Sequence, residues 1–170
     1  MLHSTNPQGD AREHSDMTRA AKINTPATSP DTDFHAWALQ TAEAIRARRF
    51  AGIDWDAVAE EVEDMGRSER RALESRLEVL LAHLIKWRFQ PEARSSSWTG
   101  TIKEQRRKVQ RLLTQNPSLR PRLPEIVAEV YGSARAMAER DTGIDESTFP
   151  SSCPWSLGKI LSESFLPDHG

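Results

Sequence analysis

The stretch that decides the fold runs from Glu60 to Arg94 and reads EEVEDMGRSERRALESRLEVLLAHLIKWRFQPEAR. From Leu73 to Trp87 its apolar residues recur at steps of three and four, which is the period of one helix face. A helix this apolar belongs at the centre of a bundle. Gly66 stands before it, and glycine is the residue that most easily ends a helix. The stretch therefore predicts a short acidic helix, residues 54–66, followed by a long central helix, residues 68–89.

Further helices are predicted on both sides of this stretch, and no segment shows the alternation of a strand. Proline, glycine and capping-type residues mark their ends. The expected spans are residue 33 to about 49, residue 97 to the stop at 116–117, residue 124 to 143, and a short segment after Ser156. The sequence thus predicts an all-α fold, a single-domain helical bundle of about five main helices plus a short C-terminal helix.

The beginning of the chain differs from the rest in composition. Residues 1–32 are rich in Ser, Thr, Asn, Pro and Asp and show no periodic apolar pattern, so we expect a disordered N-terminal tail there. Residues 33–167 form the expected helical bundle domain. A chain of 170 residues fits one such domain by length.

Charge and cysteine usage narrow the class of protein. The formal net charge is -2, so the overall charge does not point to nucleic acid. Cys153 is the only cysteine, which rules out an internal disulfide and a thiolate metal cage, and we expect it to pack as a small apolar residue. The first thirty residues lack the apolar run of a signal peptide, and no later run is long enough to cross a bilayer. We therefore expect a cytoplasmic protein without membrane association.

Six polar side chains are predicted to meet where three helices of the bundle adjoin. Two flank the apolar stripe of the 54–66 helix, two follow one edge of the central helix, and two lie on the next helix, one of them on its apolar face. Carboxylate, imidazole and guanidinium groups in contact have shifted pKa values, which is the mark of acid–base chemistry. We favour a structural network in which these groups satisfy one another, because buried polar groups must be hydrogen-bonded. The six are Glu61, Glu63, Glu69, His83, Gln105 and Arg106.

Metal binding is a weaker hypothesis for the same region. A site made of Glu61, Glu63 and His83 would have a single nitrogen ligand, and the Glu-x-x-His pairs of carboxylate-bridged di-metal bundles do not occur in the sequence. The sequence also lacks a glycine-rich phosphate loop, a nucleophile elbow and a His-Glu-x-x-His motif. We therefore expect no cofactor.

A strongly basic segment follows the central helix. Residues 94–122 carry eight basic residues against one acidic residue, whereas residues 54–64 carry six acidic residues and no basic one. Together with Trp98 the basic segment could contact phosphate backbones. We favour the simpler interpretation, in which oppositely charged helices attract each other or present solvated faces. The bases are Arg94, Lys103, Arg106, Arg107, Lys108, Arg111, Arg120 and Arg122.

Several spaced motifs in order along the chain resemble those of a known family. They are Asp33-Phe34 with Trp37, Glu60-Glu61-Val62-Glu63 with Gly66, the run from Leu73 to Trp87, Gln90-Pro91-Glu92, Ser97-Trp98, Ile102 with Gln105-Arg106, and Cys153-Pro154-Trp155-Ser156. In these residues the chain is similar to the bacterial family called domain of unknown function twenty-nine, over residues 33–167. The resemblance implies an all-helical bundle in a small bacterial protein with no established activity.

Three functional hypotheses follow. The first is a non-enzymatic protein-interaction module with a protein partner, because no recognisable catalytic set accompanies the core. The second is a metal- or acid/base-dependent, nuclease-like enzyme that uses Glu61, Glu63, His83 and Arg106. The third is association with nucleic acid through the basic helix after residue 96, which we do not favour.

Overall fold

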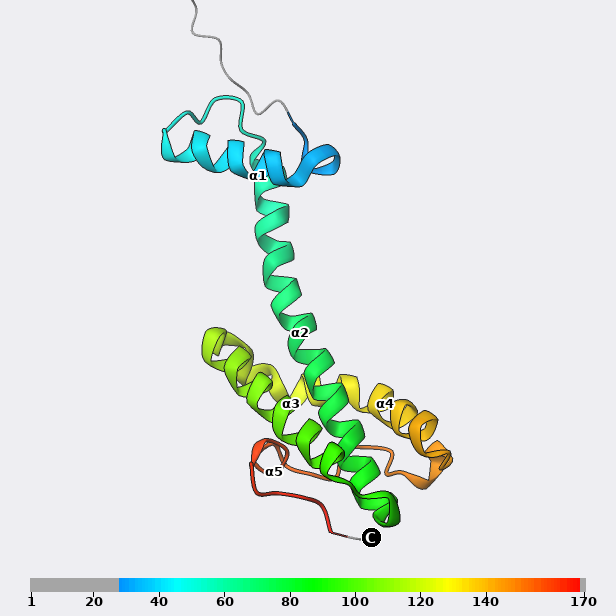
Figure 1. Cartoon of the computed structure of the whole chain (residues 1–170). Coiled ribbons are helices and arrows are strands. Elements are labelled where there is room, and N and C mark those ends of the chain that lie inside the picture. The colour runs from blue at the N-terminus through cyan, green and yellow to red at the C-terminus, as the bar shows by residue number, and fades with distance from the viewer. Residues whose placement is uncertain (1–27, 169–170) are drawn as a thin grey trace, which may run out of the picture. The chain divides into compact units, whose positions relative to one another are not determined.

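The computed structural model describes residues 28–168, and Figure 1 traces their helices. Within these residues every regular element is helical, so the predicted all-α fold is confirmed. The chain divides into two compact units, Met1–Glu60 and Glu61–Gly170. The α-helices are α1 (Pro30–Arg46), α2 (Trp55–Phe89), α3 (Ser96–Gln115), α4 (Leu123–Thr142) and α5 (Leu157–Leu161). The 3-10 turns are η1 (Pro91–Ala93), η2 (Pro117–Arg122) and η3 (Glu146–Thr148).

The first helix begins earlier than predicted. Its N-cap is Ser29, whose hydroxyl accepts a hydrogen bond from the Asp31 N–H at 3.2 Å. Asp33 then departs from helical geometry (φ -154°, ψ 85°), and its carboxylate accepts a hydrogen bond from the Ala36 N–H at 3.0 Å. A helix that starts near residue 33 would have Asp31 or Thr32 as its cap. That expectation is wrong, because Ser29 caps the first turn and Asp33 caps the helix again after the kink. Residues 30–32 of the predicted tail are helical, and residues 1–27 of it lie outside the described residues.

The remainder of the N-terminal unit is a turn that leads into α2. Gly52 follows the expected span of the first helix and is the residue expected to form the turn there. It adopts the left-handed conformation (φ 86°), which glycine takes without steric cost, in agreement with that expectation. Asp54 then caps α2, since its carboxylate accepts a hydrogen bond from the Ala57 N–H at 3.0 Å. The buried residues of residues 28–60 are few: Trp37, Thr41, Ala44 and Ile53.

The predicted break at Gly66 is wrong, because α2 continues through it as one helix of 35 residues. Among the described residues the glycines with positive φ are Gly52 and Gly143, so Gly66 does not adopt the helix-ending conformation. Arg67 binds Glu63 and Asp64 at 3.1 and 2.8 Å, and these ion pairs span the glycine within the helix. Residue 68, the predicted start of the central helix, is thus an interior position of α2, and two of the expected main helices are one.

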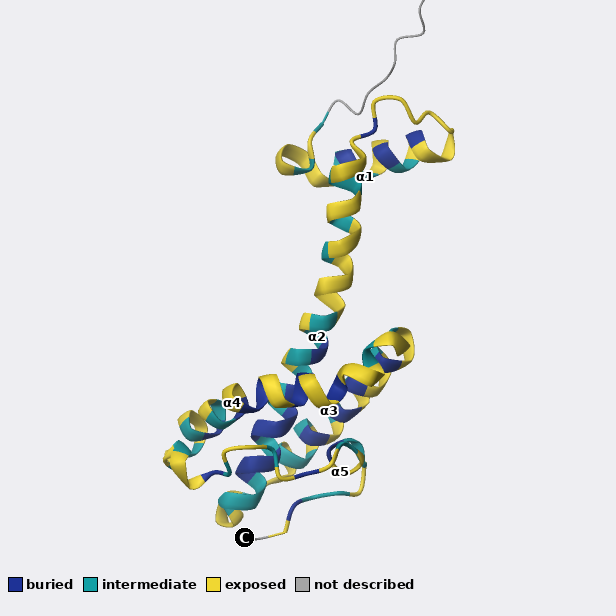
Figure 2. Cartoon of the chain, turned by 180° about the vertical axis from the view of Figure 1, so that it is seen from behind, coloured by how far each residue is buried: buried dark blue, intermediate teal, exposed yellow. Residues whose placement is uncertain are grey.

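The core of the C-terminal unit surrounds the second half of α2, as predicted. Figure 2 shows the buried residues on this half of α2 and on the sides of α3 and α4 that face it. The side chains of Leu73, Leu77, Leu80, Leu81, Leu84 and Ile85 have no exposed surface, and Ile102, Leu113, Ile126, Ala134 and Ile160 pack with them. By contrast residues 61–72 of α2 include no buried residue.

The first helix ends at Arg46, earlier than the predicted end near residue 49, whereas the ends predicted for the helices that follow α2 agree with the structure within one or two residues. The hydroxyl of Ser95 accepts a hydrogen bond from the Trp98 N–H at the start of α3, which ends before Asn116. Gly143 terminates α4 with φ 73°. The hydroxyl of Ser156 caps α5, a helix of 5 residues.

Candidate functional site

Glu61 and Glu63 of the predicted polar cluster lie far from His83 because α2 does not break. Glu61 and His83 are on the same continuous helix, so at about 1.5 Å per residue they are roughly 33 Å apart along its axis. Glu63 is exposed and pairs with Arg67 at 3.1 Å. A helix break at Gly66 would have allowed the acidic segment to fold back, and the continuous helix prevents this.

Glu69 makes a contact between helices, although not the predicted one. Its carboxylate accepts a hydrogen bond of 3.0 Å from the side-chain amide of Asn116, the residue that follows α3. The same amide donates to the carbonyl of Leu112 at 3.2 Å. Glu69 is therefore an exposed acceptor that supports the end of α3.

His83 is bound within its own helix. Its Nδ1 lies 2.9 Å from the carbonyl oxygen of Val79, and because a carbonyl only accepts, Nδ1 carries the proton and donates. Burial lowers the pKa of His83 and outweighs the hydrogen bond to Val79, and the nearby positive charge of Lys86 lowers that pKa further. The imidazole is therefore neutral at neutral pH.

Arg106 is the most deeply buried charged residue of the predicted cluster, with 1% of its surface exposed. Its Nε donates to the Ile160 carbonyl at 2.8 Å and its Nη2 donates to the Phe165 carbonyl at 2.7 Å. Its Nη1 also lies 3.4 Å from the Glu163 carbonyl. Burial lowers the pKa of Arg106, and the charge of Glu163 acts in the opposite direction. The guanidinium thus holds the C-terminal segment against α3.

Gln105, beside Arg106, is buried, and its side-chain oxygen has no hydrogen-bond partner. Between the six predicted residues, all of which lie within residues 28–168, no hydrogen bond or ion pair is formed. They make separate contacts to α2, to the end of α3 and to the C-terminal segment. The predicted meeting of the six at one place is therefore not observed.

The three weak metal-ligand candidates are not brought together either. Throughout the part of the chain that the structure describes, no three His, Cys, Asp or Glu side chains are grouped so that they could hold a metal ion. Glu61, Glu63 and His83 are therefore not assembled as ligands.

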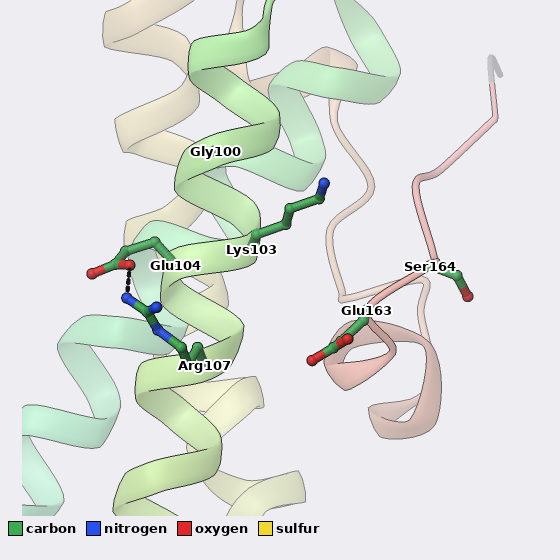
Figure 3. Close-up of a pocket in the computed structure, with 6 residues that line it drawn as sticks. All are labelled: Gly100, Lys103, Glu104, Arg107, Glu163 and Ser164. Carbon is green, nitrogen blue, oxygen red and sulfur yellow. Dashed lines mark hydrogen bonds and ion pairs between the residues drawn. The ribbon is translucent and has the colours of Figure 1, made fainter.

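Three of the bases on helix α3 make contacts within the molecule. Glu104 binds both Arg107 and Lys108, the latter at 2.9 Å, and Arg106 is directed into the core. Figure 3 shows Lys103, Glu104 and Arg107 on α3 beside a groove whose other wall is formed by Glu163 and Ser164. The groove has a volume of about 570 Å³. Since both signs of charge line it, its surface does not form the uniformly positive track that a phosphate backbone requires.

One charged contact of the core was not predicted from the sequence. Lys86 is buried on the apolar half of α2, and its ammonium binds Asp141 of α4 at 3.0 Å and lies 4.8 Å from the ring centre of Trp98. Burial opposes ionisation of Asp141, but the hydrogen bond and charge of Lys86 and those of Arg140 together lower its pKa. A lysine in an otherwise apolar helix stretch was the available signal, because such a side chain needs an acidic partner.

The protein defined by this fold is a small all-α bundle in which a buried arginine secures the C-terminal segment. It belongs to the family described as Domain of unknown function DUF29, whose family model matches residues 31–166. No curated protein and no solved structure shows a significant match to the chain. None of the helices in residues 28–168 combines the length and the apolar character that crossing a bilayer requires.

Proposed function

We propose that this chain is a non-enzymatic protein-interaction module whose N-terminal unit carries the surface for the partner. The observation that supports this proposal is the number of large apolar side chains exposed in residues 28–60. Leu39 is 60% exposed, and three aromatic residues are about half exposed, namely Phe34, Phe50 and Trp55. Trp55 belongs to the apolar stripe of the predicted 54–66 helix, which was expected to face the core, so its exposure is a correction.

Several large apolar side chains of this unit thus remain in water, whereas its buried core is small. Exposed apolar area is unfavourable by roughly 25 cal/mol per Å², so a partner that covers these side chains gains free energy. Aromatic residues are also the type that most often dominates binding at protein interfaces. The rings of Phe50 and Trp55 lie 6.1 Å apart and so form a continuous apolar feature.

The charge of the unit indicates the chemistry of the partner. Residues 28–60 contain six acidic and three basic residues, so a protein surface with an apolar centre and a basic rim is complementary to them. The polar residues first considered for catalysis support the proposal indirectly, because their contacts are structural ones. Arg106, for example, uses its guanidinium to bind three backbone carbonyls.

The test compares the full-length protein with a double variant, Leu39→Ser with Phe50→Ser, purified from cells that make it. We expect one stoichiometric partner of the wild type, and a loss of affinity of about tenfold or more in the variant, since 1.4 kcal/mol corresponds to tenfold. Arg107→Ser on α3 is the matched control and should retain the partner. A photo-crosslinker at position 39 should map to an apolar, basic-rimmed segment of that partner. Equal recovery by the double variant, or crosslinks only to a second copy of this chain, would contradict the proposal.

A further inference from the structure

A second groove lies on the C-terminal unit, between α4 and the segment that leads into α5. Its volume is about 600 Å³, which is within the range of small-molecule sites. Val127, Trp155 and Leu157 provide apolar walls, and Cys153 lines it together with Tyr131. The groove is separate from the exposed apolar surface of residues 28–60, so an assignment to it goes beyond the proposed function.

Tyr131 gives this groove a hydrogen-bond donor without an acceptor. Only 2% of the residue is exposed, and its hydroxyl has no hydrogen-bond partner. Buried polar groups are almost always paired, so an unpaired hydroxyl beside a groove indicates a missing acceptor. Burial, with a smaller contribution from Cys153, raises the pKa of Tyr131 to about 12. The hydroxyl is therefore protonated and able to donate at neutral pH.

The same corner of the molecule carries further donors without acceptors. Arg135 follows Tyr131 by one helical turn, so the two side chains share a face of α4. The Nε atoms of Arg135 and Arg88 are both buried without a hydrogen-bond partner. Residues 28–168 contain five buried side-chain atoms without a hydrogen-bond partner. Three of the five are hydrogen-bond donors of this region, namely the two Nε atoms and the Tyr131 hydroxyl. These three donors therefore lack acceptors.

The acceptor that fits this region is negatively charged. Arg135 binds Glu146 at 2.8 Å, whereas Arg88 forms no ion pair within residues 28–168 and lies over the ring of Phe89 at 5.3 Å. The ring centres of Phe89 and Phe149 are 5.2 Å apart. This contact places the end of α2 beside Phe149, the residue that follows η3. Arg88 is not among the residues that line the groove, but its positive charge acts on Tyr131. A guanidinium without an ion-pair partner favours an anionic oxygen over a neutral one.

We propose that this groove binds a small organic carboxylate. One carboxylate oxygen accepts the hydrogen bond of Tyr131, the charge of Arg88 stabilises the anion, and the apolar part of the ligand lies along Val127, Trp155 and Leu157. Glu129 also lines the groove, and its carboxylate is bound by Arg70 at 2.6 Å. The apolar walls favour an organic acid over free phosphate.

Cys153 provides a specific readout, because it is the only cysteine of the chain and it lines the groove. The experiment measures the rate at which a disulfide reagent modifies the full-length protein at one alkaline pH, since burial raises the pKa of this thiol. Benzoate at about ten times its Kd should slow the modification roughly tenfold, by mass action. Benzyl alcohol and inorganic phosphate, at the same concentration, should leave the rate unchanged.

The decisive variant is Tyr131→Phe, which removes an unpaired hydroxyl and keeps the ring. We expect the thermal midpoint of the free protein to be unchanged and the protection by benzoate to be lost. Lys103→Gln, in the other groove, is the control and should keep the protection. The proposal is overturned if benzoate does not protect the wild type, if it protects Tyr131→Phe equally, or if benzyl alcohol or phosphate protects as well. A lower midpoint of free Tyr131→Phe would likewise overturn it, because the hydroxyl would then hold a structural bond.

Discussion

The Nε of Arg106 donates a hydrogen bond of 2.8 Å to the backbone carbonyl of Ile160, which lies 54 positions later in the chain. The carbonyl of Phe165 accepts a second bond at 2.7 Å. A charge at the centre of the C-terminal unit is thus stabilised by carbonyl dipoles. No ion pair forms at this guanidinium within residues 28–168.

Replacing Arg106 with leucine should destabilise the protein strongly. The backbone carbonyls of the C-terminal segment would lose their donors, and hydrogen bonds to charged groups contribute about 1.5–3 kcal/mol each. Allowing for relaxation of the segment, we expect a loss of about 3 kcal/mol in the free energy of unfolding, measured in urea. Arg107→Leu, at the exposed neighbouring position, should change it by less than about 0.5 kcal/mol. Similar losses in the two variants would refute the role given to Arg106.

Alanine at Gly66 should stabilise the protein. The position is inside α2, and a β-carbon there would meet nothing within 4 Å. Glycine in a helix interior costs about 1 kcal/mol relative to alanine, so Gly66→Ala should raise the free energy of unfolding by about that amount. Gly143→Ala is the opposite case, because its φ of 73° is strained for any residue with a side chain, and it should destabilise. A destabilising Gly66→Ala would show that the helix ends there after all.

Removing the charge of Asp141 should expose the cost of burying Lys86. In Asp141→Asn the ammonium would lose its ion-pair partner while still buried, so we expect a loss of about 2–3 kcal/mol at neutral pH in thermal or urea unfolding. Glu63→Gln, which breaks an exposed pair, should have an effect below about 1 kcal/mol. An effect of Asp141→Asn no larger than that of Glu63→Gln would mean that the pair contributes nothing to stability.

The contribution of Asp141 should also depend on pH in a definite direction. Its pKa in the folded protein is lowered from 3.8, so the unfolded chain takes up a proton first on acidification. The stabilisation is therefore complete above 3.8 and is lost as the pH falls through the lower pKa of the folded state. Unfolding measured between neutral and strongly acid pH should show wild type and Asp141→Asn converging at the acid end.

His83 should make the protein less stable on mild acidification. Burial lowers its pKa from 6.5, so below that pH the unfolded state binds a proton more readily than the folded state does. The free energy of unfolding should therefore fall as the pH decreases from 6.5 toward the folded pKa. His83→Gln lacks this titration, so the advantage of the wild type over the variant should shrink across that window. A gap that widens on acidification would indicate that His83 gains its proton on folding.

Much of the fold could be predicted from local patterns. The apolar period of Leu73–Trp87 identified the central helix, and Asp54, Gly143 and Ser156 marked helix ends where the structure confirms them. The predictions that were wrong also have a physical explanation. Gly66 is a strong stop signal in isolation, but the charged residues around it form ion pairs along the helix and the helix continues.

The candidate site was less predictable, because angular position on a helix does not identify the neighbour. Arg106 was placed on the flank of an apolar face, and its partners are carbonyls of a segment more than fifty residues away. A backbone carbonyl has no signature in the sequence. The unpaired hydroxyl of Tyr131 was invisible for the same reason, since pairing depends on every surrounding group.

The sequence by itself determined that this chain is helical, where its apolar core lies, and which family it belongs to, because helix periods and spaced motifs are local properties. Only the tertiary structure decided which polar groups meet. A continuous α2 separated Glu61 from His83, and the folding of the C-terminal segment onto α3 brought carbonyls to Arg106. Hydrogen bonds act over about 3 Å, so such pairings depend on the packing of distant segments.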